Sequence, residues 1–315
     1  MRVLCYTLRP LTAFGTPLAG DTLFGQLCWT LRHQLGHARL QALLEGYTTG
    51  RPFVVVSDAM PSGHVPLPVL PSAAWVSSEN ADRKALKKRR WLAVDDLARP
   101  LPQWQSFARA DAELAPVTER AQPHNTINRQ TGTTGTGPFA PYSMSQRWYT
   151  QDTRLDVHVA LDDSRLSEDE LGAALAYIGA TGFGRDASIG LGKFELAAAA
   201  RPVQWHRPAG ANRYLTLGPS APQGLGFCPV RSSWQVLTRF GRHGDAAVQG
   251  GSPFKKPLLL AQAGAVFRPE TLDPALAIIG QGLGGELQPI SAAMPQTVHQ
   301  GYAPVIPILC PEVAA

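Results

Sequence analysis

Regularly spaced leucines in residues 21–35 constrain the fold of this chain more than any other sequence feature. The four leucines recur at every fourth residue, as on the apolar face of an amphipathic helix: Leu23, Leu27, Leu31 and Leu35. Asp21 is placed to act as the N-cap of this helix. Residues 2–8, rich in β-forming side chains, precede it, and the apolar residues 52–57 follow it. The first part of the chain therefore predicts a strand, a helix and a second strand.

A second unit of the same kind follows after a long gap. Residues 154–161 alternate apolar and polar side chains, which predicts a strand with one buried and one exposed face. Ser167 and Glu170 have the spacing of a capping box that starts a helix running to about residue 180. Residues 191–198 predict a last strand. The combined order is the βαββαβ pattern of a ferredoxin-like or RNA-recognition-motif-like (RRM-like) domain.

The remaining segments predict an insertion and a second domain. Regular signals fade between residues 58 and 143, where prolines interrupt helices and central strands. Beyond residue 200 only short β-forming segments recur, and residues 256–260 and 265–267 suggest a hairpin. We therefore expect an α+β fold of two tandem ferredoxin-like/RRM-like domains. The first spans residues 1–200 with the loop-rich insertion 58–143, and the second, degenerate copy spans residues 201–315.

Composition restricts the class of protein. The chain of 315 residues has a net charge of +5, which suits a polyanionic partner without establishing one. Four isolated cysteines and no C-x-x-C pair predict neither a zinc cage nor a disulfide framework, and free thiols suit a reducing cytosol. No apolar run is long enough to span a membrane, and the start is too short for a signal peptide. We expect a cytoplasmic protein that needs no cofactor.

A glycine-rich segment between the second helix and the last strand is the most distinctive local feature. It combines small residues with two cations and a hydroxyl: Gly182, Phe183, Gly184, Arg185, Ser188, Gly190, Gly192 and Lys193. Glycines let the backbone approach a ligand closely, and successive free N–H groups can form an anion-binding concavity. A tight helix-to-strand turn with solvated cations is the alternative.

The insertion holds two further polar or basic segments. The first is a Gly/Thr-rich loop with donors on a flexible backbone: His124, Asn125, Asn128 and Arg129. Tyr142, Trp148 and Tyr149 follow it and suit stacking on splayed bases, although core packing is the commoner use of such rings. The second is residues 83–90, with six cations in eight positions, which predicts a short basic helix or a solvated face. Lys255 and Lys256 add cations in the C-terminal part.

Catalytic patterns are weak in this sequence. His33 and His37 have metal-like spacing on a helix, but no third ligand accompanies them. His124 is a candidate general base for RNA cleavage, because imidazole titrates near neutral pH. The nucleotide-binding and nucleophile motifs built on glycine are missing from the sequence. The residues favour binding over catalysis.

Three segments in order resemble a known family. Residues 20–25 with Gly20, Asp21 and Thr22, residues 124–132, and residues 182–193 are together similar to the RAMP superfamily of CRISPR proteins. More narrowly, they resemble the fourth Csm-type subunit of type III-A effector complexes. This resemblance implies two RRM-like domains and a subunit that is not a nuclease. It also implies binding of the repeat-derived 5′ tag of CRISPR RNA (crRNA).

The resemblance also implies partners and a division of roles. The partners are the large polymerase/cyclase-like subunit, the first backbone RAMP subunit and target RNA near the first pairing positions. Residues 182–193 would cradle the tag, residues 124–129 would form a thumb-like loop along the RNA, and the helix start at Gly20 would support the RNA face. Two alternatives stay open. One is a metal-independent crRNA-processing endoribonuclease with His124 as base, and the other is the equivalent subunit of another CRISPR subtype.

Overall fold

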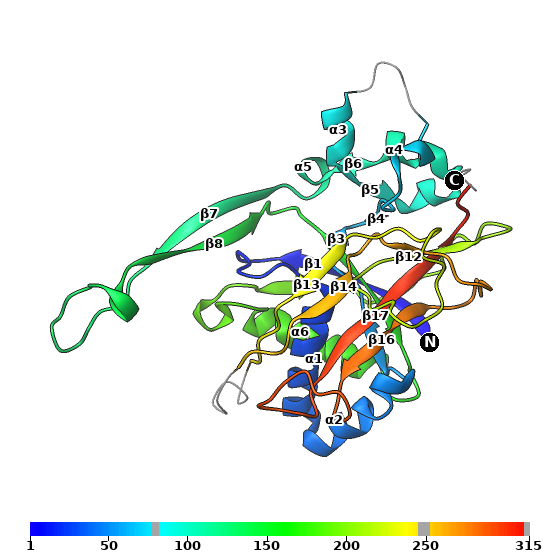
Figure 1. Ribbon diagram of the computed structural model, residues 1–315. Coiled ribbons are helices and arrows are strands. Elements are labelled where there is room, and N and C mark those ends of the chain that lie inside the picture. The colour runs from blue at the N-terminus through cyan, green and yellow to red at the C-terminus, as the bar shows by residue number, and fades with distance from the viewer. Residues whose placement is uncertain (77–81, 245–252, 312–315) are drawn as a thin grey trace.

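The computed structural model describes residues 1–76, 82–244 and 253–311. It is a mixed α/β protein built from several small antiparallel sheets and few helices (Figure 1). The largest sheet has the strand order β10-β1-β9-β2, with short β11 paired to β1 and β3 paired to β9. Its strands are β1 (Arg2–Pro10), β2 (Val54–Val56), β3 (Met60–Pro61), β9 (Leu155–Leu161), β10 (Phe194–Leu196) and β11 (Arg201–Pro202).

The connectivity of this first sheet is the one expected from the sequence. Helix α1 (Gly20–Leu35) links β1 to β2, and α6 (Glu168–Thr181) links β9 to β10. The leucines of α1 point into a core that also contains Leu175 and Ile178 of α6. Ser167 and Glu170 form the predicted capping box at the start of α6. A shorter helix, α2 (His37–Leu44), follows α1 after Gly36, whose φ of 87° ends the first helix.

Strand β9 differs from the sequence-based expectation of one exposed face, because all seven of its residues are buried. Its polar residues are covered by segments that lie far away in the sequence. Asp156 accepts hydrogen bonds from Thr7 Oγ1 at 2.6 Å and from Arg201 Nη2 at 3.0 Å. The ring of His158 packs on Trp205, with 4.9 Å between centroids. The alternating pattern identifies the polar face of β9, but the later segment that contains Arg201 and Trp205 covers this face in the folded chain.

The C-terminal part contains a second sheet and a separate ribbon. The sheet has the order β15-β12-β17-β16, and β13 pairs with β14. The elements are β12 (Arg213–Thr216), β13 (Val236–Arg239), β14 (Leu258–Ala261), β15 (Val266–Phe267), β16 (Ile278–Gly284) and β17 (Val298–Ile308). The hairpin expected between residues 256–260 and 265–267 is wrong, because β14 and β15 pair with other strands. Among described residues after 200 there is no helix, so a degenerate second ferredoxin-like copy stays a prediction.

The two parts share buried contacts. The Gln300 side chain accepts from Val56 N at 2.8 Å and donates to Val56 O at 2.7 Å, which joins β17 to β2. Tyr302 lies in the first core and donates its hydroxyl hydrogen to Tyr47 O at 2.8 Å. Figure 1 shows β16 and β17 beside α1, in agreement with contacts between α1 and β17. The strands after residue 200 therefore complete the core of the first part.

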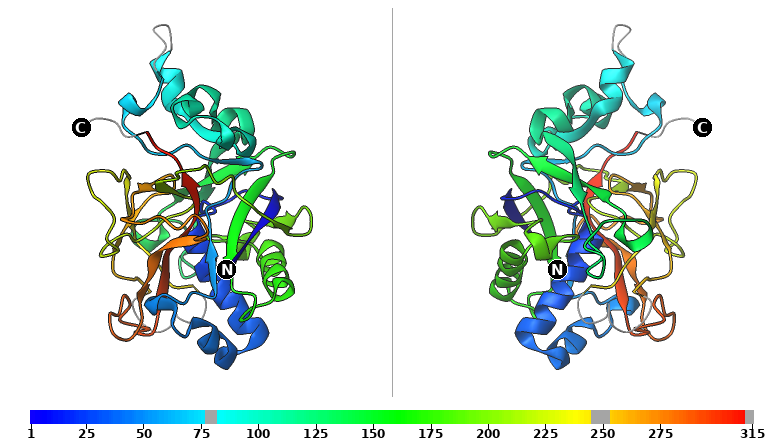
Figure 2. Two further views of the ribbon diagram at one scale, coloured as in Figure 1. Left: turned by 90° about the vertical axis from the view of Figure 1, so that its right-hand side faces the viewer. Right: turned by 90° about the vertical axis from the view of Figure 1, so that its left-hand side faces the viewer.

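The insertion forms two distinct bodies, visible in Figures 1 and 2. The first, here called the basic lobe, comprises residues 62–76 and 82–116, with an interior of Leu92, Leu97, Leu101 and Trp104. Its elements are β4 (His64–Pro66), α3 (Arg83–Lys88), β5 (Arg89–Ala93), α4 (Trp104–Phe107), β6 (Arg109–Ala110) and α5 (Asp111–Leu114). The basic run therefore begins with the predicted helix and continues into a strand. No helix in the described ranges has the length and apolar content needed to cross a membrane.

The second body of the insertion, here called the arm, is a long hairpin that projects away from the sheets (Figure 1). It comprises β7 (Val117–His124), β8 (Tyr142–Tyr149) and the connecting residues 125–141. The strands pair along their whole length, from Val117 opposite Tyr149 to His124 opposite Tyr142. The Gly/Thr-rich loop singled out in the sequence is thus the far end of this hairpin.

Candidate nucleic-acid interface

The glycine-rich segment has a backbone that only glycine adopts readily. Gly182, Gly184, Gly190 and Gly192 have φ between 72° and 103°, and Asp186 has φ of 64°. A Cβ on Gly192 would lie 2.1 Å from Phe183 O, and one on Gly182 would lie 2.4 Å from Leu191 O. Gly190 alone among these four has open space at its missing Cβ. Three of the glycines therefore shape the loop against its own chain, and Gly190 is the one open to a ligand.

Side chains from the segment before α1 and from α1 itself fix this loop. Gln26 Nε2 donates to Gly182 O at 2.7 Å, and Gly184 N donates to Gln26 Oε1 at 2.9 Å. Thr12 Oγ1 accepts from Lys193 N at 2.9 Å. The loop is therefore held in one shape without a ligand, while the side chains of Ser188 and Lys193 keep access to solvent.

Arg185 connects the loop to the arm. Its Nη2 donates to Ser145 O of β8 at 2.7 Å, and its Nε lies 3.3 Å from Asp186 Oδ2. The side chain of Arg185 keeps 39% exposure, so its guanidinium remains accessible at the base of the arm. Phe183 is fully buried in the core, so its ring is not available for stacking on a base.

The arm has one face on which aromatic and polar side chains alternate along the hairpin. His124 stacks on Tyr142 at the far end, with 5.3 Å between centroids, and Arg120 lies 5.8 Å from the ring of Trp148 nearer the base. Tyr142 is 50% exposed and Trp148 is 41% exposed. Opposed residues on paired strands share a face, so these rings point to the same side. Exposed rings with neighbouring cations are suited to stacking on nucleic acid bases.

The polar residues of the arm's end have different roles. Asn128 shapes the turn, because its Oδ1 accepts from Gln130 N at 2.9 Å and its N donates to Thr133 O. Asn125 and Arg129 are exposed. Among the described residues, none forms a hydrogen bond with His124 Nε2. The geometry therefore makes His124 part of an aromatic pair.

The start of α1 does not form an open phosphate site. Ala19, not Asp21, is the N-cap, and Gly20 N donates to the carboxylate of Asp58 at 2.7 Å. Asp21 is buried, where Arg239 donates to it twice, at 2.6 and 2.9 Å. His299 Nε2 lies 3.2 Å from the same carboxylate. The predicted RNA contact of the Asp21 side chain is therefore replaced by an internal ion pair that joins α1 to β13 and β17.

The groups around Asp21 explain why its buried carboxyl is ionised. Burial alone would raise the pKa of Asp21, but the contacts with His299 and Arg239 outweigh it and hold the pKa below the usual value. Lys255 lies near this cluster, and burial lowers the pKa of its amine. Lys256 is exposed. These two lysines therefore face different surroundings, and Lys255 belongs to the buried charge cluster.

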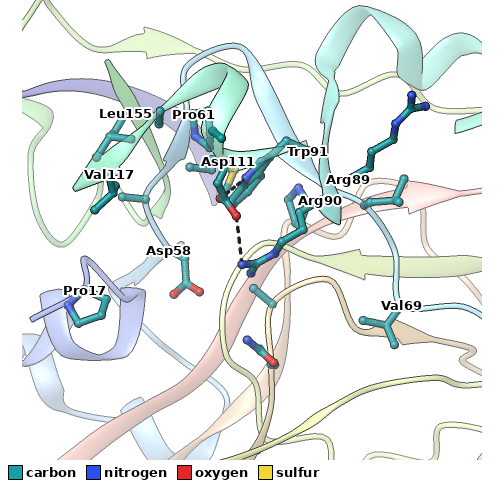
Figure 3. A pocket seen from close by; sticks show the side chains of 18 of the residues that line it. Pro17, Asp58, Pro61, Val69, Arg89, Arg90, Trp91, Asp111, Val117 and Leu155 are labelled. Carbon is teal, nitrogen blue, oxygen red and sulfur yellow. Dashed lines mark hydrogen bonds and ion pairs between the residues drawn. The ribbon is translucent and has the colours of Figure 1, made fainter. Parts of the chain in front are cut away.

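Residues that sequence reasoning missed form a pocket beside the base of the arm (Figure 3). This arm-base pocket has a volume of about 900 Å³ and lies where the first sheet, the basic lobe, the arm and the C-terminal part meet. Its polar and aromatic lining includes Asp58, Lys87, Arg89, Arg90, Trp91, Asp111, Glu119, Arg147, Tyr149, Gln235 and Gln262. The basic run was the sequence signal for this site, but its partners come from distant segments.

Asp58 lies at the inner wall of this pocket. Burial raises the pKa of its carboxyl to about 7, the nearby charge of Asp21 adds to this, and the hydrogen bond from Gly20 opposes it. The carboxyl therefore keeps its proton to a higher pH than an exposed aspartate does. Since Asp58 accepts from Gly20 N, it also takes the place of a side-chain cap for α1.

We expect Asp58→Asn to stabilise the fold, and the gain to grow with pH. The folded-state pKa of Asp58 is raised, so the unfolded chain releases this proton first and the wild-type unfolding free energy falls between about pH 4 and pH 7. The amide avoids the buried charge and still accepts from Gly20. Because the pocket admits some water, we expect a gain of about 1–2 kcal/mol near pH 8. Melting temperatures across a pH series check this, and an equal gain at every pH would contradict it.

The metal-like histidine pair is not supported by the geometry. His33 lies on α1 and His37 begins α2, and Gly36 breaks the helix between them. The ring of His33 stacks on Trp29, 6.4 Å away between centroids. Within residues 1–76, 82–244 and 253–311, no group of three His, Cys, Asp or Glu side chains is placed to hold a metal ion.

Comparison with solved structures finds the same fold in chains of type III CRISPR assemblies. The chain has the Csm4-like fold. It aligns over 99% of its length, and over 100% of the other chain, with the crystal structure of a Csm1–Csm4 cassette in complex with pppApA, at a TM-score of 0.63 and 16% identity. The cassette in complex with AMPPNP gives the same values.

A second assembly gives a similar result. The Csm3–Csm4 subcomplex of a type III-A CRISPR-Cas interference complex aligns with 98% of this chain and 100% of its own, at a TM-score of 0.59 and 11% identity. No family model matches the sequence, and no curated protein matches it. At these identities the likeness establishes the fold, and the activity has to be argued from the residues.

Proposed function

We propose that this chain is a non-catalytic, RNA-binding scaffold subunit of a type III-A CRISPR interference complex. In this role it holds the repeat-derived 5′ tag of crRNA and docks the large polymerase/cyclase-like subunit and the first backbone subunit. The observation that carries the proposal is the whole-chain likeness to the Csm4 fold in assemblies named for Csm1 and Csm3. As part of the same proposal, the chain consists of two tandem ferredoxin-like domains.

The glycine-rich segment and the arm are the parts of the chain that suit this role. Arg185 and Lys193 supply positive charge, and Ser188 a hydroxyl, on a loop whose shape is already fixed. Gly190 leaves room for close approach of a sugar or phosphate. The arm projects from the same place, because Arg185 bonds its strand β8. A strand of RNA that crosses the loop would therefore continue along the aromatic face of the arm.

Replacement of Arg185 and Lys193 by alanine should weaken capture of crRNA that carries its 5′ tag. We expect a loss of about tenfold at low salt, and a salt dependence that is shallower by about one unit of log–log slope for each lost phosphate contact. Filter binding across a salt series measures both quantities. Arg51→Ala is the matched control, since Arg51 is exposed and its Nη2 lies 3.7 Å from Glu45 Oε1 at the surface. An unchanged affinity and slope would rule out this loop.

Incubation of the purified chain with repeat RNA tests the claim that the subunit is not a nuclease. We expect intact RNA, because His124 stacks on Tyr142 and none of the described residues forms a hydrogen bond with its Nε2. Site-specific cleavage without metal, lost in His124→Ala, would instead make the chain a crRNA-processing endoribonuclease.

A further inference from the structure

The arm-base pocket is a large hollow, and the RNA contacts proposed above leave it empty. Its walls come from the first sheet, the basic lobe, the arm and the C-terminal part. Figure 3 shows Asp58 on one wall and Arg90, Trp91 and Asp111 on the facing wall, with Val117 and Leu155 beyond. A volume of about 900 Å³ is well above what one nucleotide needs and within the range of small-molecule sites.

The cations of this pocket are only partly neutralised. Arg90 lies 3.4 Å from Asp111, but its side chain is 58% exposed. Arg147 lies 3.9 Å from Glu119, and its Nε makes no hydrogen bond. Lys87 projects from α3 at the rim and is exposed. Charged donors at the mouth of a pocket, with capacity left for another acceptor, suit a phosphate group.

The interior of the pocket offers flat surfaces and hydrogen-bonding groups. Trp91 and Tyr149 line it, with Trp91 fixed by a 2.7 Å bond from its Nε1 to Asp111. Asp58, Gln235 and Gln262 contribute a carboxyl and two amides. Asp58 Oδ1 is used by Gly20, so Oδ2 can face an entering group. Aromatic faces next to carboxyl and amide groups are the elements with which proteins hold a splayed base.

We propose that the arm-base pocket takes one nucleotide of bound RNA, with its phosphate at Lys87, Arg90 and Arg147 and its base inside against Trp91 or Tyr149. This inference rests on the proposed function and extends it to the basic lobe. Asp58 and the two glutamines would accept from or donate to the edge of the base.

A nucleotide fits this pocket better than a protein segment because of what surrounds it. Arg147 and Tyr149 belong to β8, the strand that also contributes Ser145 to the contact with Arg185. Because side chains alternate along a strand, Arg147 and Tyr149 point to the face of the arm opposite Tyr142 and Trp148, so the pocket lies on the other face of the arm at its base. Four cations line it against three carboxyl groups, so its lining attracts a polyanion.

Two lysines of one short helix provide the test. Lys87 lines the pocket, whereas Lys84 lies on the same helix, is exposed, and is outside the lining. With RNA that carries a repeat-derived 5′ end, we expect Lys87→Ala and Arg90→Ala each to weaken binding by the full chain by about tenfold. Lys84→Ala should change the affinity by less than about twofold, because a remote surface charge is screened. Melting curves of the variants verify that the fold is retained.

Ultraviolet crosslinking of the same complex, followed by peptide mapping, locates the base directly. We expect a crosslinked peptide that contains Trp91 or Tyr149. Equal losses for Lys84→Ala and Lys87→Ala, or crosslinks confined to the end of the arm, would overturn the pocket while the RNA-binding function stands. Crosslinks to a protein partner at Trp91, with RNA bound elsewhere, would overturn it in the same way. A wild-type chain that binds no RNA would overturn the proposed function and the pocket together.

Discussion

Arg239→Ala should lower the unfolding free energy by about 3–5 kcal/mol, the cost typical of leaving one partner of a buried ion pair uncompensated. Asp21 has a fully buried side chain and receives two hydrogen bonds from Arg239. His299 Nε2, 3.2 Å away, is the other side-chain atom close to this carboxylate. Because this cluster joins α1 to β13 and β17, its loss should loosen the contact between the two parts of the chain. Denaturant unfolding followed by fluorescence measures the change.

Two further variants distinguish the stability lost with the ion pair from the stability lost by shortening any arginine side chain. Arg242→Ala removes an exposed arginine near the same ribbon, stacked on Phe254, and should cost less than about 0.5 kcal/mol. The double variant Asp21→Asn with Arg239→Met should be more stable than Arg239→Ala, because the Asp21 carboxylate is no longer left buried without its arginine partner. If Arg239→Ala and Arg242→Ala cost the same, the pair does not stabilise the junction.

The effect of Arg239→Ala should also depend on pH. The folded-state pKa of Asp21 is lowered, so the stability from its ion pair is present above about pH 4 and is lost as the pH falls through the folded pKa. The difference between wild type and variant should therefore shrink in acid. This is the opposite direction to Asp58, whose raised pKa makes the charged form costly at high pH.

Tyr142→Ala and Trp148→Ala should each weaken RNA binding by about tenfold or more, since base–aromatic stacking contributes roughly 1–3 kcal/mol per base. Both rings are exposed on one face of the arm, and neither belongs to the buried core clusters. We therefore expect melting temperatures to stay near that of the wild type. Fluorescence anisotropy with labelled crRNA measures the affinity.

Ile127→Ala is the matched control for the arm. Ile127 is also exposed, at 55%, and lies near the arm's end, but it has no ring. Its replacement should leave the affinity within about twofold of the wild type. If all three variants behave alike, the arm contributes by its length or backbone, and the stacking role of its aromatic face is wrong.

Local signals in the sequence predicted the local structure well. Leucines at every fourth residue gave α1, the Ser167 and Glu170 pair gave the start of α6, and the run of cations began a helix as expected. The βαββαβ order followed from these elements. Each of these features depends on residues within one or two turns or on simple alternation, so it can be inferred without knowing what lies opposite.

Features that depend on distant residues were not predictable in this way. Asp21 had the position of an N-cap, yet Arg239, more than 200 residues later, draws it into a buried pair. The polar face of β9 became buried because Arg201 and Trp205 return across it. Both outcomes require the tertiary arrangement, which overrides what local position favours.

The same distinction between local and distant residues applies to the candidate site. The glycine-rich segment was recognisable because its composition alone implies unusual backbone angles, and four of its glycines have positive φ. The burial of Phe183 and the role of Arg185 as a link to Ser145 depend on β8 lying beside the loop. The arm-base pocket could not be predicted, because Asp58 and Arg90 face each other only once distant parts of the chain have come together.

Purification of this chain from its host with an affinity tag, followed by sequencing of the bound RNA, tests the central claim most directly. The account predicts RNAs that share one repeat-derived 5′ end and differ downstream, together with a large polymerase/cyclase-like protein and a backbone subunit. Bound RNAs without a common 5′ end, or recovery of the chain without RNA, would contradict it.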